Sequence, residues 1–301
     1  MSNHTSFTSA NVLLTRRDFT RLAIGALGLT ALSGCSSADA SAPGTAAATA
    51  AATYPITKAS DGTYVLKAIA DATPHAEILA YAAPALAADG ITVDLVSTAP
   101  DDTLNQRTED GEIDFNYDQH VPYLNEWNQK NAGDLVSAGN IHVEPITAYS
   151  DTYATTADVP DDAKVAIPNN ATNEYRALKI LEDNGFIVLS DASKDSLSAS
   201  KEDITTYVRP VEIVELDAAQ IIPTRESFDL YITNTNRYIE SGITANKLFS
   251  ESADSPYANV VVVRPENKDN EAITKLVEVL RSDDVKGFIE QKYNGAVVPS
   301  A

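Results

Sequence analysis

The residues best suited to bind a small anion follow a short apolar strand in the second half of the chain. Residues 164–168 read as that strand, an Asn-Asn-Ala-Thr loop follows, and a helical pattern begins near Asn173. Thr172 or Asn173 can cap the helix, whose free N–H groups and dipole favour an anion. Arg176 lies in the first turn, where its guanidinium could hold a carboxylate through two parallel hydrogen bonds. A surface arginine paired with a nearby glutamate is the alternative.

A second group of candidate binding residues lies at the end of another expected strand, residues 113–117. Asn116, Tyr117 and His120 bring an amide, an aromatic ring and an imidazole to its carboxyl end. Such residues suit an apolar ligand tail flanked by hydrogen-bonding groups. A junction between a strand and a helix with capping amides is the alternative interpretation.

Two amides follow a third expected strand, residues 230–233. The side-chain carbonyl oxygens of Asn234 and Asn236 could accept hydrogen bonds from an ammonium group. A simple turn is the alternative here.

Metal binding and hydrolysis are the competing chemistries. The chain after residue 53 holds three histidines, His75, His120 and His142, and His142 would share a strand face with Glu144. Three histidines and a carboxylate can bind zinc. The sequence has no histidine pair at i, i+4, no Gly-x-Ser-x-Gly motif and no glycine-rich phosphate loop. We therefore expect no metal site, no cofactor and no enzymatic activity.

Strand and helix patterns alternate along the chain and would position these residues. The expected strands are 64–70, 91–96, 113–117, 134–138, 141–149, 164–168, 211–216, 230–233 and 259–264. Helical patterns cover 75–88, 103–108, 120–130, 173–183, 270–282 and 284–292. The polar stretch 190–203 reads as an exposed loop or a frayed helix. The alternation predicts an α/β fold of two lobes with largely parallel sheets, in which ligands bind at the carboxyl ends of the strands.

Composition narrows the class of protein. The chain has 301 residues, 44% of them hydrophobic, and a formal net charge of −21. That surplus of acid argues against a nucleic-acid-binding protein, because phosphate binding depends on Lys and Arg. The apolar content is ordinary and periodic, which argues against a disordered chain. A single cysteine excludes a disulfide within the chain and a cysteine-built metal site.

The first 53 residues have the pattern of an export signal followed by a flexible tether. Residues 1–34 read as an export signal, whose apolar run 22–32 is too short to span a bilayer. Arg16, Arg17 and Phe19 fit a twin-arginine signal, with an ordinary positive segment as the alternative. The Leu-Ser-Gly-Cys motif ending at Cys35 matches a lipobox, which predicts a lipidated cysteine rather than a buried thiol. Residues 35–53 then form a lipidated, flexible tether rich in Ala, Ser and Thr.

Six segments, in order and with natural spacing, closely resemble the methionine-binding lipoproteins of ABC importers, the NlpA/MetQ family. They include Asn-Tyr-Asp-Gln-His-Val-Pro-Tyr-Leu, His-Val-Glu-Pro and the strand, loop and helix that contain Arg176. The resemblance spans roughly 64–299, and six segments in register are more specific than any one motif. The segments are residues 73–79, 116–124, 142–145, 165–178, 215–220 and 254–262.

The resemblance implies a type II periplasmic-binding-protein fold. Two α/β lobes, joined by two crossing strands, would close around a ligand. Lobe I would comprise 54–147 and 257–301, and lobe II would comprise 148–256. The crossings would lie near 148–150 and 257–260. The protein would be a monomeric, extracytoplasmic lipoprotein, anchored to the cell membrane through Cys35, that delivers its ligand to an ABC permease and its ATPase.

The resemblance also implies roles for single residues. Arg176, with Asn173 beside it, would hold the ligand carboxylate, and Asn234 would bind the ammonium. Tyr117 and His120 would line the pocket for a thioether. Two further residues would reach the cleft, His75 and Tyr149. A zwitterion needs just such an anion site, an ammonium site and an apolar slot, and L-methionine is the first expected ligand.

The chain departs from the family pattern at four places. Tyr175 stands where glycine is usual, Asp118 where phenylalanine is frequent, and Arg237 where tyrosine is common. The loop 70–74 lacks the usual Gly-Ala-Thr-Pro start. These changes keep the alternatives of another amino acid or a methionine-containing dipeptide open. A metal-binding lipoprotein, or one that acts in signalling or adhesion, are the alternatives from other classes.

Overall fold

The computed structural model describes residues 54–194, 199–252 and 255–300. They belong to one compact unit of the chain. The predicted export signal, Cys35 and tether lie outside the described residues. Within the described ranges, no helix combines the length and the apolar character needed to cross a membrane.

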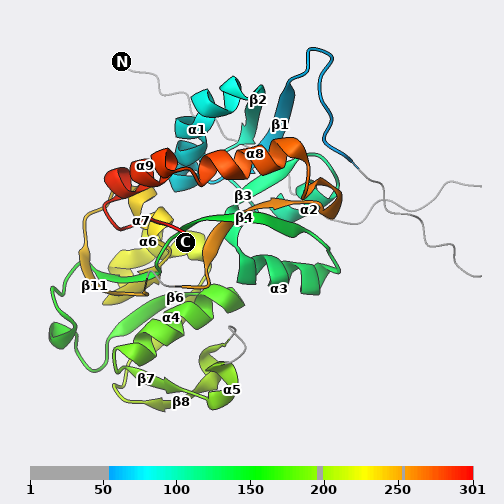
Figure 1. Cartoon of the computed structure of the whole chain (residues 1–301). Coiled ribbons are helices and arrows are strands. Elements are labelled where there is room, and N and C mark those ends of the chain that lie inside the picture. The colour runs from blue at the N-terminus through cyan, green and yellow to red at the C-terminus, as the bar shows by residue number, and fades with distance from the viewer. Residues whose placement is uncertain (1–53, 195–198, 253–254, 301) are drawn as a thin grey trace, which may run out of the picture. The chain divides into compact units, whose positions relative to one another are not determined.

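Six strands form the first sheet, in the order β13-β4-β12-β3-β1-β2 (Figure 1). The strands β1, β2 and β3 run parallel, whereas β12 is antiparallel to β3 and β4, and β13 is antiparallel to β4. The sheet is therefore mixed rather than largely parallel. Its strands are β1 (Tyr64–Ala70), β2 (Ile91–Ser97), β3 (Phe115–His120), β4 (Val136–Val143), β12 (Ala258–Val263) and β13 (Val298–Pro299).

Helices cover both faces of this sheet, and successive valines of β12 point alternately into the two cores that lie beneath them. Val261 and Val263 belong to the larger core, with side chains from α1 (Glu77–Ala88), α8 (Glu271–Leu280) and α9 (Asp283–Tyr293). Val260 and Val262 join a smaller core on the other face. That face also carries α2 (Leu104–Glu109) and α3 (Val121–Asn131).

Five strands form the second sheet, in the order β11-β5-β10-β6-β9. The strands β6, β9 and β10 are parallel, and β5 is antiparallel to β10 and β11. One face packs against α4 (Ala171–Asp183) and the hairpin of β7 (Ile187–Leu189) and β8 (Ile204–Tyr207), the other against α6 (Ala218–Thr224) and α7 (Thr235–Ser241). The strands are β5 (Thr147–Ser150), β6 (Lys164–Pro168), β9 (Glu212–Leu216), β10 (Leu230–Thr233) and β11 (Asn246–Ser250).

The chain passes between the sheets after β4 and again before β12. The single strand expected over 141–149 is broken at Glu144, Pro145 and Ile146, and its second part is β5 in the other sheet. Proline has no N–H for a ladder, which suits the break. The predicted crossing at 148–150 is therefore wrong by a few residues, since these residues lie inside β5.

The short elements escaped the sequence prediction. The hairpin β7–β8, strand β11, and helices α6 and α7 are each too brief for a clear periodicity. The polar stretch 190–203 holds α5 (Asp191–Lys194) and a helical turn at Lys201–Asp203, with 195–198 outside the described residues. Other single turns occupy Ala72–Ala76, Thr156–Asp158, Arg225–Ser227 and Pro265–Asn267.

Candidate functional site

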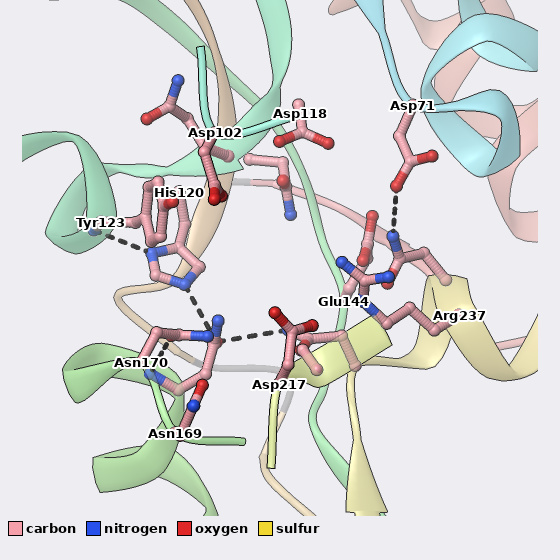
Figure 2. Close-up of a pocket in the computed structure, with 16 residues that line it drawn as sticks. Asp71, Asp102, Asp118, His120, Tyr123, Glu144, Asn169, Asn170, Asp217 and Arg237 are labelled. Atoms are coloured by element: carbon pink, nitrogen blue, oxygen red, sulfur yellow. Dashed lines mark hydrogen bonds between the residues drawn. The ribbon is translucent and has the colours of Figure 1, made fainter. Parts of the chain in front are cut away.

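A polar cavity of about 380 Å³ lies where strands of both sheets end (Figure 2). Its walls come from the residues that follow β1, β2, β6, β9 and β10, from the end of β3 and the start of α3, from the first crossing and from the start of β12. Four of these strands end in a loop or helix N-terminus that turns its polar residues toward the same space, as expected for α/β sheets. The lining residues are Asp71, Asp102, Asp118, Gln119, His120, Tyr123, Glu144, Asn169, Asn170, Asn173, Asp217, Ala218, Asn234, Asn236, Arg237 and Asn259.

One amide oxygen organises one wall of the cavity. The Oδ1 of Asn173 accepts hydrogen bonds from His120 Nε2 at 3.2 Å, Arg176 Nη1 at 3.1 Å and Asn234 Nδ2 at 3.3 Å. Asn173 is itself placed by helix α4, whose cap is Asn170, with its Oδ1 3.1 Å from the Asn173 N–H. The sequence predicted Thr172 or Asn173 as the cap of this helix, and that prediction is wrong, because the cap is Asn170. Three of the predicted site residues therefore share a single acceptor.

The bonds of His120 fix its tautomer. Its Nδ1 accepts the N–H of Tyr123, so its Nε2 carries the proton donated to Asn173. Burial, helped by the nearby Arg176 charge, lowers the pKa of His120 to about 3. The imidazole is therefore neutral at physiological pH and can present no positive charge to a ligand.

Arg176 stands behind this wall rather than on it. The residue is 2% exposed and does not line the cavity. Its Nη2 lies 2.6 Å from Glu251 Oε2 and 2.7 Å from the Glu144 carbonyl oxygen, and its guanidinium covers the ring of Tyr257 at 4.4 Å. The partner is therefore a partly buried glutamate from the second crossing, and not a neighbour on its own helix. Direct contact between Arg176 and a ligand carboxylate stays a prediction.

A chain of buried hydrogen bonds supports another wall. Tyr117 donates to His142 Nδ1 at 2.5 Å, and His142 Nε2 donates to Glu144 Oε1 at 2.8 Å. His75 Nε2 lies 3.1 Å from Asn259 Oδ1. Tyr117 and His75 themselves are buried behind Glu144 and Asn259, which line the cavity. The two predicted residues thus position lining groups.

Burial controls the protonation of the groups in this chain of hydrogen bonds. It raises the pKa of Glu144 to about 7 and lowers the pKa of His142 to about 3. The ligand-type atoms of His75, His142 and Glu144 all lie within 4.8 Å of one another, so the three could hold a metal ion. Sequence spacing had paired only the last two, because His75 comes from a distant loop.

The last two predicted residues serve packing. Asn116 is fully buried and donates to Asn105 Oδ1 at 3.1 Å and Thr108 Oγ1 at 2.8 Å, which ties β3 to α2. Tyr149 stacks on Tyr238 with ring centroids 4.0 Å apart. Neither residue lines the cavity.

Sequence reasoning gave no binding role to most of the charged lining residues. Five carboxylates and one guanidinium, Arg237, face the cavity. Burial raises the pKa of Asp118 to about 7, with Asp71 adding to the rise and Arg237 opposing it. The available signal was position, since Asp71 and Asp217 directly follow strands, Asp118 lies near the end of β3, and Arg237 lies in the first turn of α7, which follows β10.

The pKa of Asp118 predicts a pH-dependent effect of Asp118→Asn. The folded state holds this proton more tightly than the unfolded chain, where the ordinary pKa is 3.8. The stability that this group contributes is full below about pH 4 and is lost as the pH rises toward about 7. Asparagine does not titrate, so the variant should gain stability relative to wild type over that window and then level off. Urea unfolding across the window measures the difference.

The control for this experiment is Asp94→Asn, which removes an exposed carboxylate from β2. A stability difference between Asp118→Asn and wild type that stays flat from about pH 4 to about pH 7 would contradict the prediction.

Two mixed β-sheets, each covered by helices, are joined by two crossings of the chain and meet at a polar cavity. This arrangement defines a type II periplasmic binding protein. Residues 66–301 match the family of NlpA lipoproteins. The chain belongs to that family, which confirms the family and the fold predicted from the sequence.

Named relatives and solved structures agree with this assignment. The chain is 35% identical over 248 residues to the methionine-binding lipoprotein MetQ of Bacillus subtilis, covering 80% of this chain and 90% of that one. It is 36% identical over 230 residues to the membrane lipoprotein TpN32 of Treponema pallidum, covering 76% and 85%. The structure of a nutrient-binding protein of Burkholderia cenocepacia bound to methionine is similar at a TM-score of 0.75, with 31% identity over 78% of this chain and 100% of that one.

Proposed function

We propose that the protein is the extracytoplasmic substrate-binding lipoprotein of an ABC importer, which captures a free amino acid and delivers it to a membrane permease and its ATPase. The cavity at the strand ends is the observation that carries this proposal. Membership of the NlpA lipoprotein family and relatives named for methionine support it. L-Methionine is therefore the reference ligand, with another amino acid or a methionine-containing dipeptide as alternatives.

The wall formed by Asn173 and Asn234, which we call the amide wall, suits the head group of an amino acid. Asn234 uses its Nδ2 to reach Asn173, which leaves its Oδ1 as an acceptor for the ligand ammonium. The Nδ2 of Asn173, at the first turn of α4, can donate to the carboxylate where the helix dipole also favours an anion. Arg176 would add its positive charge from behind, while its bond to Asn173 fixes the amide.

The lobes proposed for closure are 54–147 with 257–301, and 148–256. The distribution of strands between the two sheets supports this division, since β1 to β4, β12 and β13 share one sheet and β5, β6 and β9 to β11 the other. Lipid on Cys35 would anchor the protein, as a monomer, at the outer face of the membrane. Two or more acyl chains would hold it firmly.

Calorimetric titration of the purified protein tests the proposal. The protein is first unfolded and refolded to remove any ligand carried from the cell, and the standard L-amino acids, D-methionine and Gly-Met are then titrated. Binding of at least one amino acid is expected, whereas silence toward all of them would overturn the function.

Asn234→Ala tests the ammonium site. Loss of its carbonyl acceptor should weaken amino-acid binding more than about tenfold, which corresponds to about 1.4 kcal/mol. A variant that binds like wild type in the same titration would show that the ammonium is held elsewhere. Asn169→Ala, an exposed amide of the same cavity, is the matched control.

Metal binding is the second candidate, carried by the cluster of His75, His142 and Glu144. The facing atoms already have partners, which are Asn259 for His75 and Glu144 for His142. A metal would have to replace these hydrogen bonds. Stoichiometric metal in elemental analysis of the purified protein, removed by a chelator with loss of thermal stability, would support this alternative.

A further inference from the structure

One part of the cavity differs in chemistry from the amide wall. We call the group of Asp71, Asp118, Asn236 and Arg237 the far end. Asn236 Nδ2 donates to Asp71 Oδ2 at 2.8 Å, and both Asp71 and Arg237 act electrostatically on Asp118. In Figure 2, Asp71 and Arg237 lie on the opposite side of the view from Asn169 and Asn170. A ligand held by the amide wall would therefore extend its side chain toward the far end.

The far end has acceptors that lack donors. Asn236 is 6% exposed, yet its Oδ1 has no hydrogen-bond partner among the described residues. The Asp118 carboxylate likewise receives no hydrogen bond and forms no ion pair in the part of the chain that the structure describes. Asn236 Oδ1 is buried and Asp118 is partly buried, and acceptors withdrawn from water in this way are costly unless something donates to them. These acceptors point to a ligand that supplies the missing donors.

The cavity also lacks the surface that a thioether would need. Among the described residues, Ala218 is the only aliphatic one that lines it, and the only rings are those of His120 and Tyr123. Small-molecule pockets that hold apolar groups are lined mainly by hydrophobic side chains. A methionine side chain would donate no hydrogen bond and would leave the far-end acceptors unpaired.

From these observations we infer that the ligand is an amino acid whose side chain ends in a hydrogen-bond-donating nitrogen, a carboxamide or an amine. The inference rests on the proposed function and specifies its ligand. The nitrogen donates to Asp118 and Asn236. A carboxamide also offers its oxygen to Arg237, whose guanidinium has no hydrogen bond or ion pair with any described residue. An amine gains instead from the excess of carboxylates over the single guanidinium in the cavity.

Competition between matched amino acids tests the inference. The refolded, full-length protein is titrated with L-glutamine, L-lysine, L-methionine and L-glutamate by calorimetry at low and moderate salt. Glutamine and methionine have side chains of similar length, so the ratio of their affinities reports the contribution of the hydrogen-bond donor that methionine lacks. Glutamine or lysine should bind at least about tenfold tighter than methionine, because a site with unpaired polar groups rejects an analogue that cannot fill them. Glutamate should bind more weakly than glutamine.

Asp118→Asn separates the two nitrogen groups. It removes the charge and keeps the side-chain oxygen, so lysine binding should fall at least about tenfold and by more than glutamine binding, which keeps a neutral acceptor. Asp94→Asn, which neutralises an exposed carboxylate of β2 that does not line the cavity, is the matched control and should alter neither affinity. Urea unfolding checks that each variant is folded.

The outcomes distinguish this inference from the function it specifies. Methionine binding tighter than both glutamine and lysine would overturn the inference and leave the proposed function in place. Affinities for glutamine and lysine that both fall short of about a tenfold advantage over methionine would overturn it as well. Binding of no amino acid would overturn the proposed function, and the inference with it.

Discussion

Arg176→Ala should both destabilise the protein and remove amino-acid binding. The substitution leaves Glu251, whose side chain is 14% exposed, without its partner. Breaking a buried pair by removing one member costs about 3–5 kcal/mol of stability. It also removes one donor to the Asn173 oxygen and the positive charge behind the amide wall, so binding should weaken by about 2–5 kcal/mol. Urea unfolding and calorimetric titration measure the two losses.

A second variant separates the two effects of Arg176. Removing Glu251 as well, in Arg176→Ala with Glu251→Ala, takes away the unpaired charge, so part of the stability should return while binding stays lost. Lys179→Ala is the control on the same helix, because its ion pairs with Glu182, at 3.1 Å, and with Asp183 are partly exposed and each worth at most about 1 kcal/mol. If Arg176→Ala proves as stable as Lys179→Ala, the structural role of Arg176 is wrong.

Asn173→Ala should weaken amino-acid binding by about a hundredfold, or about 2.7 kcal/mol. Its Oδ1 is the shared acceptor of His120, Arg176 and Asn234, so the truncation frees three donors as well as removing a proposed ligand contact. Unpaired buried donors should also lower the free energy of unfolding by about 1–3 kcal/mol. Calorimetry and urea unfolding test both numbers.

An isosteric variant sharpens the test of this residue. Asn173→Asp keeps the acceptor oxygen and replaces the Nδ2 donor by a charged oxygen, so stability should be retained better than in the alanine variant while a ligand carboxylate is repelled. Unaltered affinity in both variants would place the carboxylate away from helix α4. The exposed Asn169→Ala is again the matched control.

The long elements and the family were predictable from the sequence because local patterns encode them. The valine-rich run of β12 and the amphipathic α8 have clear periodicity, and the expected helix at 270–282 matches the observed Glu271–Leu280 closely. The strand, loop and helix around Arg176 also formed as expected, because Asn and Thr favour caps and an apolar run favours a buried strand.

Contacts between distant segments were decided only by the tertiary structure. Arg176 finds Glu251 75 positions away, and Asp71 meets Asn236 165 positions away. Neither pairing has a local signal, because sequence spacing places residues on one helix or strand and says nothing of which strand ends meet.

The predicted site residues fall into two groups for the same reason, namely that sequence spacing does not show which segments meet. Residue type and strand ends were enough to select Asn173, Asn234 and His120, which line the cavity. Whether a polar residue faces the cavity or stands behind its wall depends on how the two sheets pack, and that placed Arg176 behind the wall and Arg237 on it. The sequence pattern determines on which side of its own helix or strand a residue lies. The neighbours of that residue, and the pKa of its side chain, depend on burial among residues that only folding brings together.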